Sequence, residues 1–289
     1  MANLKEIRNR ISSVSSTMQI TSAMKMVSAA KLKKAQDAIT AMRPYSEKLS
    51  ELLQNLSATL DADSGSKYSD QREVKNVLVV AITSNRGLAG AFNSNIIKAA
   101  HVLANETYVG KQVDFVTIGI KGNDILKKNG KVIDHNIAIF DDLSYDATAE
   151  IAESLMKLFS EGTYDKIILV YNNFKNAATQ LVMREQFLPI LPPEVIETDS
   201  TANVDYIFEP SKAEIVEELI PKSLKTQLFK ALRDSVASEH GARMTAMHKA
   251  TDNATELRDA LKLQYNKARQ AAITNEILEI VGGAEALAG

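Results

Sequence analysis

The residues best suited to phosphate chemistry lie in TSNRGLAGAFNSN, residues 83–95, between a run typical of a strand and a run typical of a helix. Gly87 and Gly90 would let backbone amides approach a phosphate at the start of that helix, and open α/β sheets usually bind ligands at this end of a strand. The spacing matches neither G-x-G-x-x-G nor a phosphate loop that ends in G-K-[ST]. A tight turn that needs small residues is therefore the simpler explanation of these glycines.

Other candidates for chemistry are scattered. The four histidines, His101, His135, His240 and His248, form neither an i, i+4 pair nor an HExxH motif, so we predict no metal site. The acidic pairs at 141–142 and 217–218 lack the separated acid and base that hydrolysis requires. The sequence has no cysteine, which excludes disulfides, thiolate metal sites and a cysteine nucleophile. We therefore predict no catalytic residue and no cofactor.

The middle of the chain has the pattern of an open α/β sheet. Short β-branched runs at 77–82, 113–118, 166–171 and, more weakly, 204–208 are typical of buried parallel strands, and 179–190 is expected to add another. Helical stretches at 94–103, 123–128 and 146–160 alternate with them. This alternation predicts a central Rossmann-like open α/β domain with right-handed crossovers, which we place at 74–209.

The two ends of the chain have heptad patterns instead. We predict one long helix over 1–61 and another over 211–287, since neither glycine nor proline occurs from Asn3 to Met42 and no proline follows Pro221. Apolar or small residues recur with steps of three and four in both, a spacing typical of coiled coils. At a rise of about 1.5 Å per residue, each helix is longer than a domain of this size is wide, so the helices are expected to project and pair antiparallel. The predicted seams are Leu4, Ile7, Ile11, Val14, Met18 and Thr21, continuing less strictly through Met24, Val27 and Ala30, and Leu257, Leu261, Gln264, Ala268, Ala271, Asn275 and Leu278.

Charge divides the chain in the same way. The formal net charge is −2, yet residues 1–43 hold eight basic and two acidic side chains, and residues 222–270 hold ten basic and five acidic ones. Basic ends favour acidic partners, although a solvated lysine-rich helix face explains them equally well. No apolar run is long enough to span a membrane and MANLKEIRNR lacks the apolar core of a signal peptide, so we expect a cytosol-like compartment.

Three functions can be considered for a chain with a central α/β domain and two long basic helices. An α/β enzyme or binding domain with a coiled-coil oligomerisation arm is the main alternative. A scaffold on nucleic acid is disfavoured because aromatic residues do not alternate with the basic ones and the pI is about 6.2. Membrane-surface binding by residues 1–43 is disfavoured because the seam is narrow and holds Thr and Ser.

Several stretches resemble one family. These are IRNRISSVSSTMQITSAMKMVSAAKLKKAQ near the start, TSNRGLAGAFN in the middle, SEHGARMTAMHKATDNA, and YNKARQAAITNEILEIVGGAEAL at the end. They are similar to the gamma subunits of F-type ATP synthases of the bacterial type. The family signature I-T-x-E-x-x-[DE]-x-x-x-G-A is met by Ile273, Thr274, Glu276, Glu279, Gly283 and Ala284. The resemblance covers essentially the whole chain.

The resemblance implies a non-catalytic rotor shaft. In this family the paired terminal helices run inside a ring of alpha and beta subunits, and the α/β domain lies near the membrane with the epsilon subunit and the c-ring. Proton flow turns the ring and the shaft, which drives the catalytic sites of the head through ATP synthesis. The implied location is peripheral, on the cytoplasmic face of the bacterial inner membrane, which the chain reaches indirectly through the c-ring. The resemblance implies no nucleic-acid partner.

The resemblance also implies residue roles. Torque contacts with alpha and beta map onto Met24, Lys25, Arg243, Arg269, Gln270, Thr274 and Glu276, and the contact with the c-ring and epsilon maps onto Tyr206, Phe208 and Glu209. Lys25 and Asn85 depart from common family versions, and the chloroplast-type cysteine insert is absent. A half-polar tip is expected because deep apolar anchoring would favour one angle of the shaft, and Gly282 and Gly283 are expected to weaken the helix where the tip ends.

Overall fold

The computed structural model describes residues 4–58, 67–190 and 212–288, and it divides into two compact units. Unit 1 contains residues Met1–Ala29 and Arg243–Gly289, and unit 2 contains Ala30–Ala242. Two long helices, α1 (Leu4–Ala58) and α5 (Lys212–Ala288), contribute to both units. α1 passes through Pro44 without the interruption that this residue would favour.

Unit 2 is built on a sheet of five strands in the order β3-β2-β1-β4-β5. The strands are β1 (Asn76–Ile82), β2 (Gln112–Ile118), β3 (Val132–Asn136), β4 (Lys166–Phe174) and β5 (Gln180–Leu188). The first four are parallel, and β5 is an antiparallel edge strand beside β4. The predicted strands at 77–82, 113–118, 166–171 and 179–190 are confirmed, whereas β3 is an additional strand and the weak run at 204–208 lies outside the described residues.

Helices cover both faces of this sheet, as the runs of buried residues in β1 and β4 require. The helical elements between the strands are α2 (Phe92–Val102) with a π-turn at Leu103–Thr107, α3 (Ile120–Asn129), a short 3₁₀ turn at Ala138–Phe140, and α4 (Tyr145–Ser160). α4 begins where the Ser144 hydroxyl accepts a hydrogen bond from the Ala147 amide, a typical N-cap. The three predicted helices between strands are therefore confirmed.

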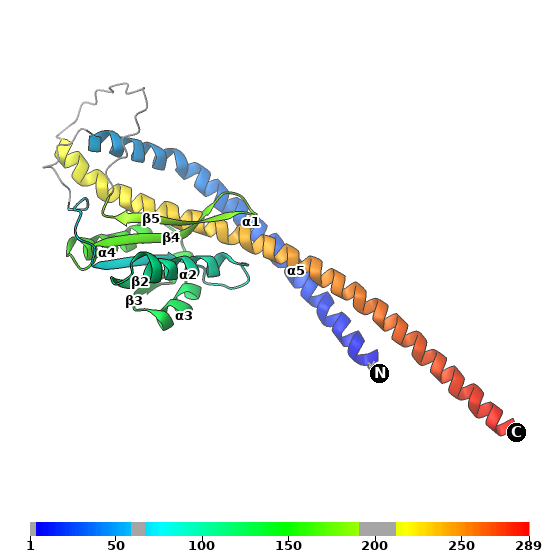
Figure 1. The fold of residues 1–289 in the computed structure, drawn as a ribbon. Helices are drawn as coiled ribbons and strands as arrows, with labels where there is room; N and C mark the ends of the chain where they lie inside the picture. Colours follow the sequence, from blue (N-terminus) through cyan, green and yellow to red (C-terminus); the bar gives the residue numbers. More distant parts are fainter. Residues whose placement is uncertain (1–3, 59–66, 191–211, 289) are drawn as a thin grey trace, which may run out of the picture. The chain divides into compact units, whose positions relative to one another are not determined.

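The alternation of side chains along each strand produces two cores. Leu78, Val80 and Ile82 of β1 point to the face covered by α4 and by α5, where Leu224, Leu228 and Leu232 are buried. Val77, Val79 and Ala81 point to the other face, against α2 and α3. Figure 1 shows the yellow half of α5 running along β4 and β5. α5 is thus an integral part of the α/β unit. Together with α4 it covers one face of the sheet, and the three elements share one core.

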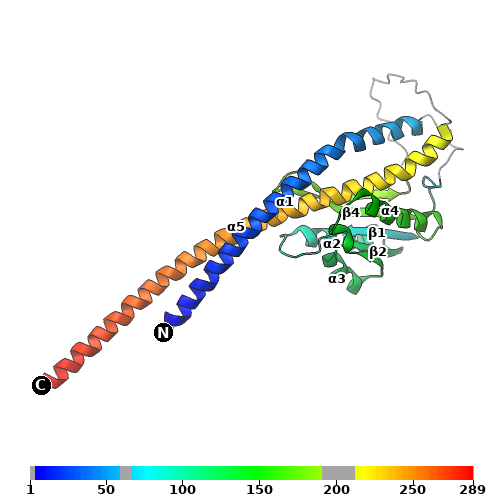
Figure 2. The same cartoon turned by 180° about the vertical axis from the view of Figure 1, so that it is seen from behind.

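The part of α1 in unit 2 runs beside the yellow half of α5 in both views (Figures 1 and 2). Its buried residues include Leu32, Ala35, Ile39 and Leu49, with the three- and four-residue steps of a heptad pattern between the first three. The predicted continuation of the seam through Val27 and Ala30 is wrong, since both side chains are exposed. None of the described helices is long and apolar enough to cross a membrane.

Candidate functional site

The candidate site of unit 1 is a pair of helices that run in opposite directions. Residues 4–29 of α1 lie beside the part of α5 that runs from Arg243 to about Ala272 (Figure 1). Near the N-terminus, the Arg8 guanidinium donates to the Tyr265 hydroxyl over 3.1 Å, and its carbon lies 5.8 Å from the centre of the same ring. Further along α1, Arg258 donates to the sulfur of Met18 over 3.3 Å. The numbers rise along one helix as they fall along the other, which confirms the antiparallel pairing.

A pair of threonines stands at the next level of this helix pair. The Thr21 and Thr251 hydroxyl oxygens are 2.8 Å apart, and Thr21 has only 9% of its surface exposed. Each hydroxyl also lies within 3.1 Å of a carbonyl oxygen of its own helix, that of Met18 or Met247. Because each hydroxyl has one hydrogen, one threonine donates to its partner while the other donates to its own helix. The interface between the helices therefore includes a polar contact at this level.

The observed seam of α1 agrees with prediction, and that of α5 does not. On α1, Ile7 and Thr21 are buried and the predicted positions between them are half-buried. On α5 a heptad series of buried and half-buried positions runs through Met247, Thr251, Ala254, Arg258, Leu261, Tyr265, Ala268 and Ala272. Only Leu261 and Ala268 belong to the predicted set, and Leu257 and Leu278 are 52% and 61% exposed. The heptad spacing was right, but most of the predicted positions are wrong. Thr251, Arg258 and Tyr265 instead contribute hydrogen bonds to the interface.

Beyond the level of Leu4, α5 continues as a helix without a partner from α1. Every residue from Ile273 to Ala286 is exposed. Ile273, Ile277 and Ile280 recur with steps of four and three and are 48%, 54% and 71% exposed, so they form an apolar stripe. The helix runs through Gly282 and Gly283 to Ala288, so the predicted weakening at this point does not end it. The tip therefore presents a large uncovered apolar surface as well as polar residues.

The residues with implied torque roles fall into two groups along unit 1. Met24 and Lys25 are half-buried and lie one turn beyond Thr21, toward Arg243, which is only 8% exposed. Arg269, Gln270, Thr274 and Glu276 lie near and beyond the start of α1, and all four are exposed. At about 1.5 Å per residue, Arg243 and Arg269 are roughly 39 Å apart along α5, so the two groups are separate.

The signature residues all lie on the unpaired tip. Ile273, Thr274, Glu276, Glu279, Gly283 and Ala284 are exposed, and within the tip the Thr274 hydroxyl donates to the Gln270 carbonyl over 2.9 Å. The residues of the expected contact with the c-ring and epsilon, Tyr206, Phe208 and Glu209, lie outside the described residues.

The candidate phosphate loop of unit 2 uses its polar groups internally. The Ser84 amide donates to the Asn93 side-chain oxygen over 2.9 Å, and the Ser84 hydroxyl donates to the Arg86 carbonyl over 2.6 Å. Asn85 donates to the Ile137 carbonyl and accepts from the Ile120 amide, which connects the loop to α3 and to the segment after β3. Gly90 has a positive φ of 56°, as a tight turn requires. The loop thus has the geometry of a self-bonded turn.

The place where an open α/β sheet of this order would bind a ligand is the carboxyl end of β1 and β4, where the strand order reverses. Here the Asn172 side chain is 1% exposed and donates to the Phe92 carbonyl over 3.2 Å. α5 closes over the same end, since a Cβ atom at Gly241 would lie 3.2 Å from the Ala177 carbonyl oxygen. Asn172 and α5 are therefore both closely packed at this end of β4.

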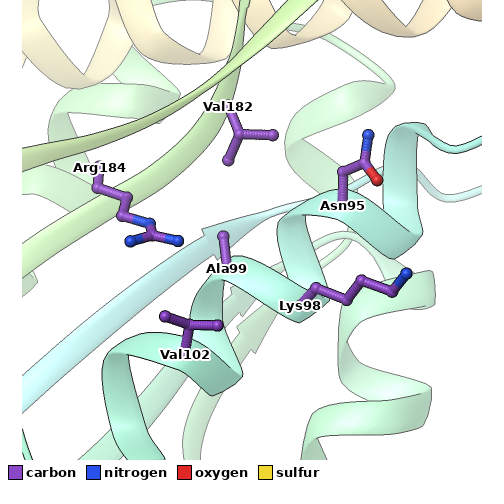
Figure 3. Close-up of a pocket in the computed structure, with 6 residues that line it drawn as sticks. All are labelled: Asn95, Lys98, Ala99, Val102, Val182 and Arg184. Carbon is purple, nitrogen blue, oxygen red and sulfur yellow. The ribbon is translucent and has the colours of Figure 1, made fainter. Parts of the chain in front are cut away.

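A shallow hollow of about 310 Å³ lies elsewhere, between α2 and β5 (Figure 3). It is lined by Asn95, Lys98, Ala99, Val102, Val182 and Arg184, and the last two come from β5. Across residues 4–58, 67–190 and 212–288, no cluster of three or more His, Asp or Glu side chains is arranged to hold a metal ion. His248 instead lies 3.3 Å from the Asp252 carboxylate on the surface of α5.

Together, these features define a class of protein in which one chain forms an open α/β unit and a second unit of two antiparallel helices. A family model described as ATP synthase matches residues 3–287. ATP synthase gamma chains from Christiangramia forsetii and Flavobacterium johnsoniae are 71% and 72% identical, and each comparison covers all of both chains. The chain therefore belongs to the ATP synthase gamma chain family.

Solved structures agree with this fold. One chain in the Euglena gracilis mitochondrial ATP synthase, in an assembly described as OSCP/F1/c-ring, has a TM-score of 0.74 at 22% identity, covering 98% of this chain and 94% of that one. A chain of the Tetrahymena thermophila central stalk and c-ring structure has a TM-score of 0.58 at 24% identity, covering 80% and 99%. The combination of paired terminal helices with an open α/β sheet is thus shared with these chains.

Proposed function

We propose that this chain works as the central shaft of an F-type ATP synthase, coupling rotation of a membrane c-ring to ATP synthesis in a head of alpha and beta subunits. The observation that carries the proposal is the helix pair of unit 1, in which α5 extends past α1 as an exposed tip. A single helix with uncovered apolar and charged residues suits a sleeve formed by other subunits. The chain is a non-catalytic subunit, and ATP is made in the head.

The helix pair suits rotation because its surface is basic and polar. Lys262, Lys267 and Arg269 are exposed on α5 beside the tip. Exposed lysine and arginine side chains exchange partners at a small cost, because exposed ion pairs are worth only about 0–1 kcal/mol each. The segment of the shaft that carries these side chains can pass acidic groups on a surrounding ring without stopping at one angle. This supports torque transfer through many weak contacts.

We rank the proposed torque contacts by how far each side chain is exposed. Arg269, Gln270, Thr274 and Glu276 are exposed and therefore available to alpha and beta. Met24 and Lys25 are half-buried, so they contribute part of their surface, and Arg243 is almost buried. Arg243 is thus expected to position its neighbours as much as to contact the head directly. Arg269 is the cleanest residue for a test.

Partners at the other end follow from the family. The epsilon subunit and the c-ring are proposed to bind through Tyr206, Phe208 and Glu209, within a middle domain at 74–209 that is flanked by helices at 1–61 and 211–287. The complex is then peripheral to the cytoplasmic face of a bacterial inner membrane, which this chain reaches through the c-ring. Family membership argues against the alternative of a separate enzyme or binding domain with an oligomerisation arm.

The test is rotation of the assembled complex. The chain is expected to co-purify with alpha, beta and epsilon, and a bead on the α/β unit should turn when ATP is added. Arg269→Glu should lower ATP-driven rotation several-fold, because it reverses a charge that faces the ring. Lys262→Glu makes the same change at another exposed position of α5 and should have a smaller effect. Equal rotation in the two variants would refute a specific role for Arg269, and a chain that neither assembles nor rotates would refute the shaft.

A further inference from the structure

α5 is joined to the β4–β5 hairpin by a set of polar contacts, which we call the polar joint. It consists of Asn172, Asn173 and Glu185 on the sheet and Gln227, Asp234 and Ser238 on the helix. We propose that the polar joint fixes the α/β unit on α5 against sliding and rotation, so that torque passes between them. This inference rests on the proposed function as a shaft and assigns the transmission to particular residues.

One end of the polar joint is centred on the carboxylate of Glu185. It accepts from the Tyr171 hydroxyl over 2.6 Å and from the Gln227 side-chain amide over 2.7 Å. The same Gln227 amide nitrogen also lies 3.2 Å from the Gln186 carbonyl oxygen. Burial raises the pKa of the Tyr171 phenol and the charge of Glu185 raises it further, so the phenol remains a donor. Two short hydrogen bonds to one charged acceptor make this the stronger end of the joint.

The other end lies three turns further along α5. The Ser238 hydroxyl donates to the Asn172 carbonyl over 3.0 Å, and the Asn173 side chain donates to the Asp234 carboxylate over 3.1 Å. Ser238, Asn172 and Asp234 are 0%, 1% and 3% exposed. Asn172 also donates to the Phe92 carbonyl, so its contact with α5 continues to the start of α2. Water has little access to these bonds.

The positions on α5 explain why the joint resists rotation. Gln227, Asp234 and Ser238 are separated by seven and four residues, so they share one face and span about 16 Å at 1.5 Å per residue. Leu224 and Leu228 lie on the same stretch and are buried against the sheet. Apolar contacts oppose separation but are not directional, whereas hydrogen bonds lose energy steeply when their angle or length changes. The leucines therefore hold the helix on the sheet, and the polar joint fixes its angle and register.

A nearby contact serves as a matched control. Lys225 and Glu153 form an ion pair of 2.5 Å between α5 and α4, but the Glu153 side chain is 60% exposed. Exposed ion pairs contribute little and are screened by salt. Glu153→Gln removes an α5 contact of the same unit without touching the polar joint. It is expected to leave coupling unchanged.

The experiment uses the whole complex in lipid vesicles. Gln227→Leu with Ser238→Ala removes two donors on the helix side and adds no charge. ATP hydrolysis by the head should be unchanged, while protons pumped per ATP should fall, because each lost hydrogen bond raises the population of slipped states about threefold or more. The deficit should grow with the opposing proton gradient, because the load on the joint grows. A merely structural role would lower the amount of complex and leave the ratio of pumping to hydrolysis unchanged.

A second variant tests the same proposal by rescue. The chain has no cysteine, so Glu185→Cys with Gln227→Cys places two thiols across the joint. Before treatment its pumping ratio should be low, and a short bifunctional maleimide should restore it, whereas the treated wild type should not change. Pumping ratios equal to that of Glu153→Gln, or failure of both joint variants to assemble, would overturn the proposal. A wild-type complex that does not pump would instead refute the shaft function itself.

Discussion

α5 contacts two different surroundings along its length. In unit 2 its Leu224, Leu228 and Leu232 are at most 2% exposed, and they belong to the core of the sheet. In unit 1 the same helix uses Thr251, Arg258 and Tyr265 toward α1, and its tip is uncovered. Burying a leucine fully is worth about 1.5–3 kcal/mol, whereas a net hydrogen bond is worth about 0.5–1.5 kcal/mol. One helix is thus strongly anchored in one unit and lightly paired in the other.

This difference suits a rotating shaft, in which α5 must be fixed firmly within the α/β unit while its surface in unit 1 must not bind tightly to the surrounding subunits. Deep apolar contacts with a surrounding ring would favour one angle, so a shaft benefits from burying Leu224, Leu228 and Leu232 in the core of unit 2. A polar seam between α1 and α5 specifies register instead, because a misaligned pair leaves hydroxyl and guanidinium groups without partners. Stability and specificity are therefore assigned to different segments of the same helix.

The largest expected effect comes from a leucine in the anchored segment. Leu228→Ala should lower the free energy of unfolding of the chain by about 2–5 kcal/mol, because it removes methyl groups and leaves a cavity at a site with no exposed surface. Leu257→Ala, at a site 52% exposed on the same helix, is the matched control and should change it by less than about 0.5 kcal/mol. Urea unfolding followed by circular dichroism measures both. Equal losses would show that the two segments are anchored alike.

A smaller effect is expected at a glycine in unit 2. Gly119 has a φ of 103°, and a Cβ atom there would lie 2.3 Å from the Thr83 carbonyl oxygen. Gly119→Ala should therefore lower the free energy of unfolding by about 1–3 kcal/mol. Gly282→Ala should have the opposite sign and stabilise the helical tip by up to about 1 kcal/mol, because Gly282 has open space around it. Thermal unfolding of the two variants compares the signs, and a stabilising Gly119→Ala would contradict the close packing of this turn.

The sequence predicted unit 2 well because its strands are buried on both faces. β-branched runs such as VLVVAI and KIILVY identify such strands without any tertiary information. β3 was not predicted, because its central residues Asp134 and His135 are polar and exposed at an edge strand. β3 therefore lacks the apolar run on which such predictions depend, whereas the other edge strand, β5, has one and was predicted.

Unit 1 was predicted in outline only. The spacing of the heptads and the antiparallel direction were correct, but the predicted α5 seam shared only Leu261 and Ala268 with the observed one and did not include Arg258. A search for apolar residues cannot identify a seam in which polar side chains find partners on another helix. The torque residues came from family resemblance alone, since exposed residues on a helix have no pattern that reveals their role. They stay proposals until the complex is tested.

The smallest expected effect lies in the polar seam and tests the comparison most directly. Thr21→Val or Thr251→Val alone should cost about 0.5–1.5 kcal/mol of unfolding free energy, because each removes one hydroxyl of the pair and keeps the side-chain shape. The double variant should cost less than the sum, since neither hydroxyl is then left facing a methyl group. A double-mutant cycle by urea unfolding gives this interaction energy. If the interaction energy is zero, the threonines bond only to their own helices and do not specify the register of α1 against α5. A favourable interaction energy would show that hydrogen bonding, rather than apolar burial, aligns α1 and α5 in unit 1.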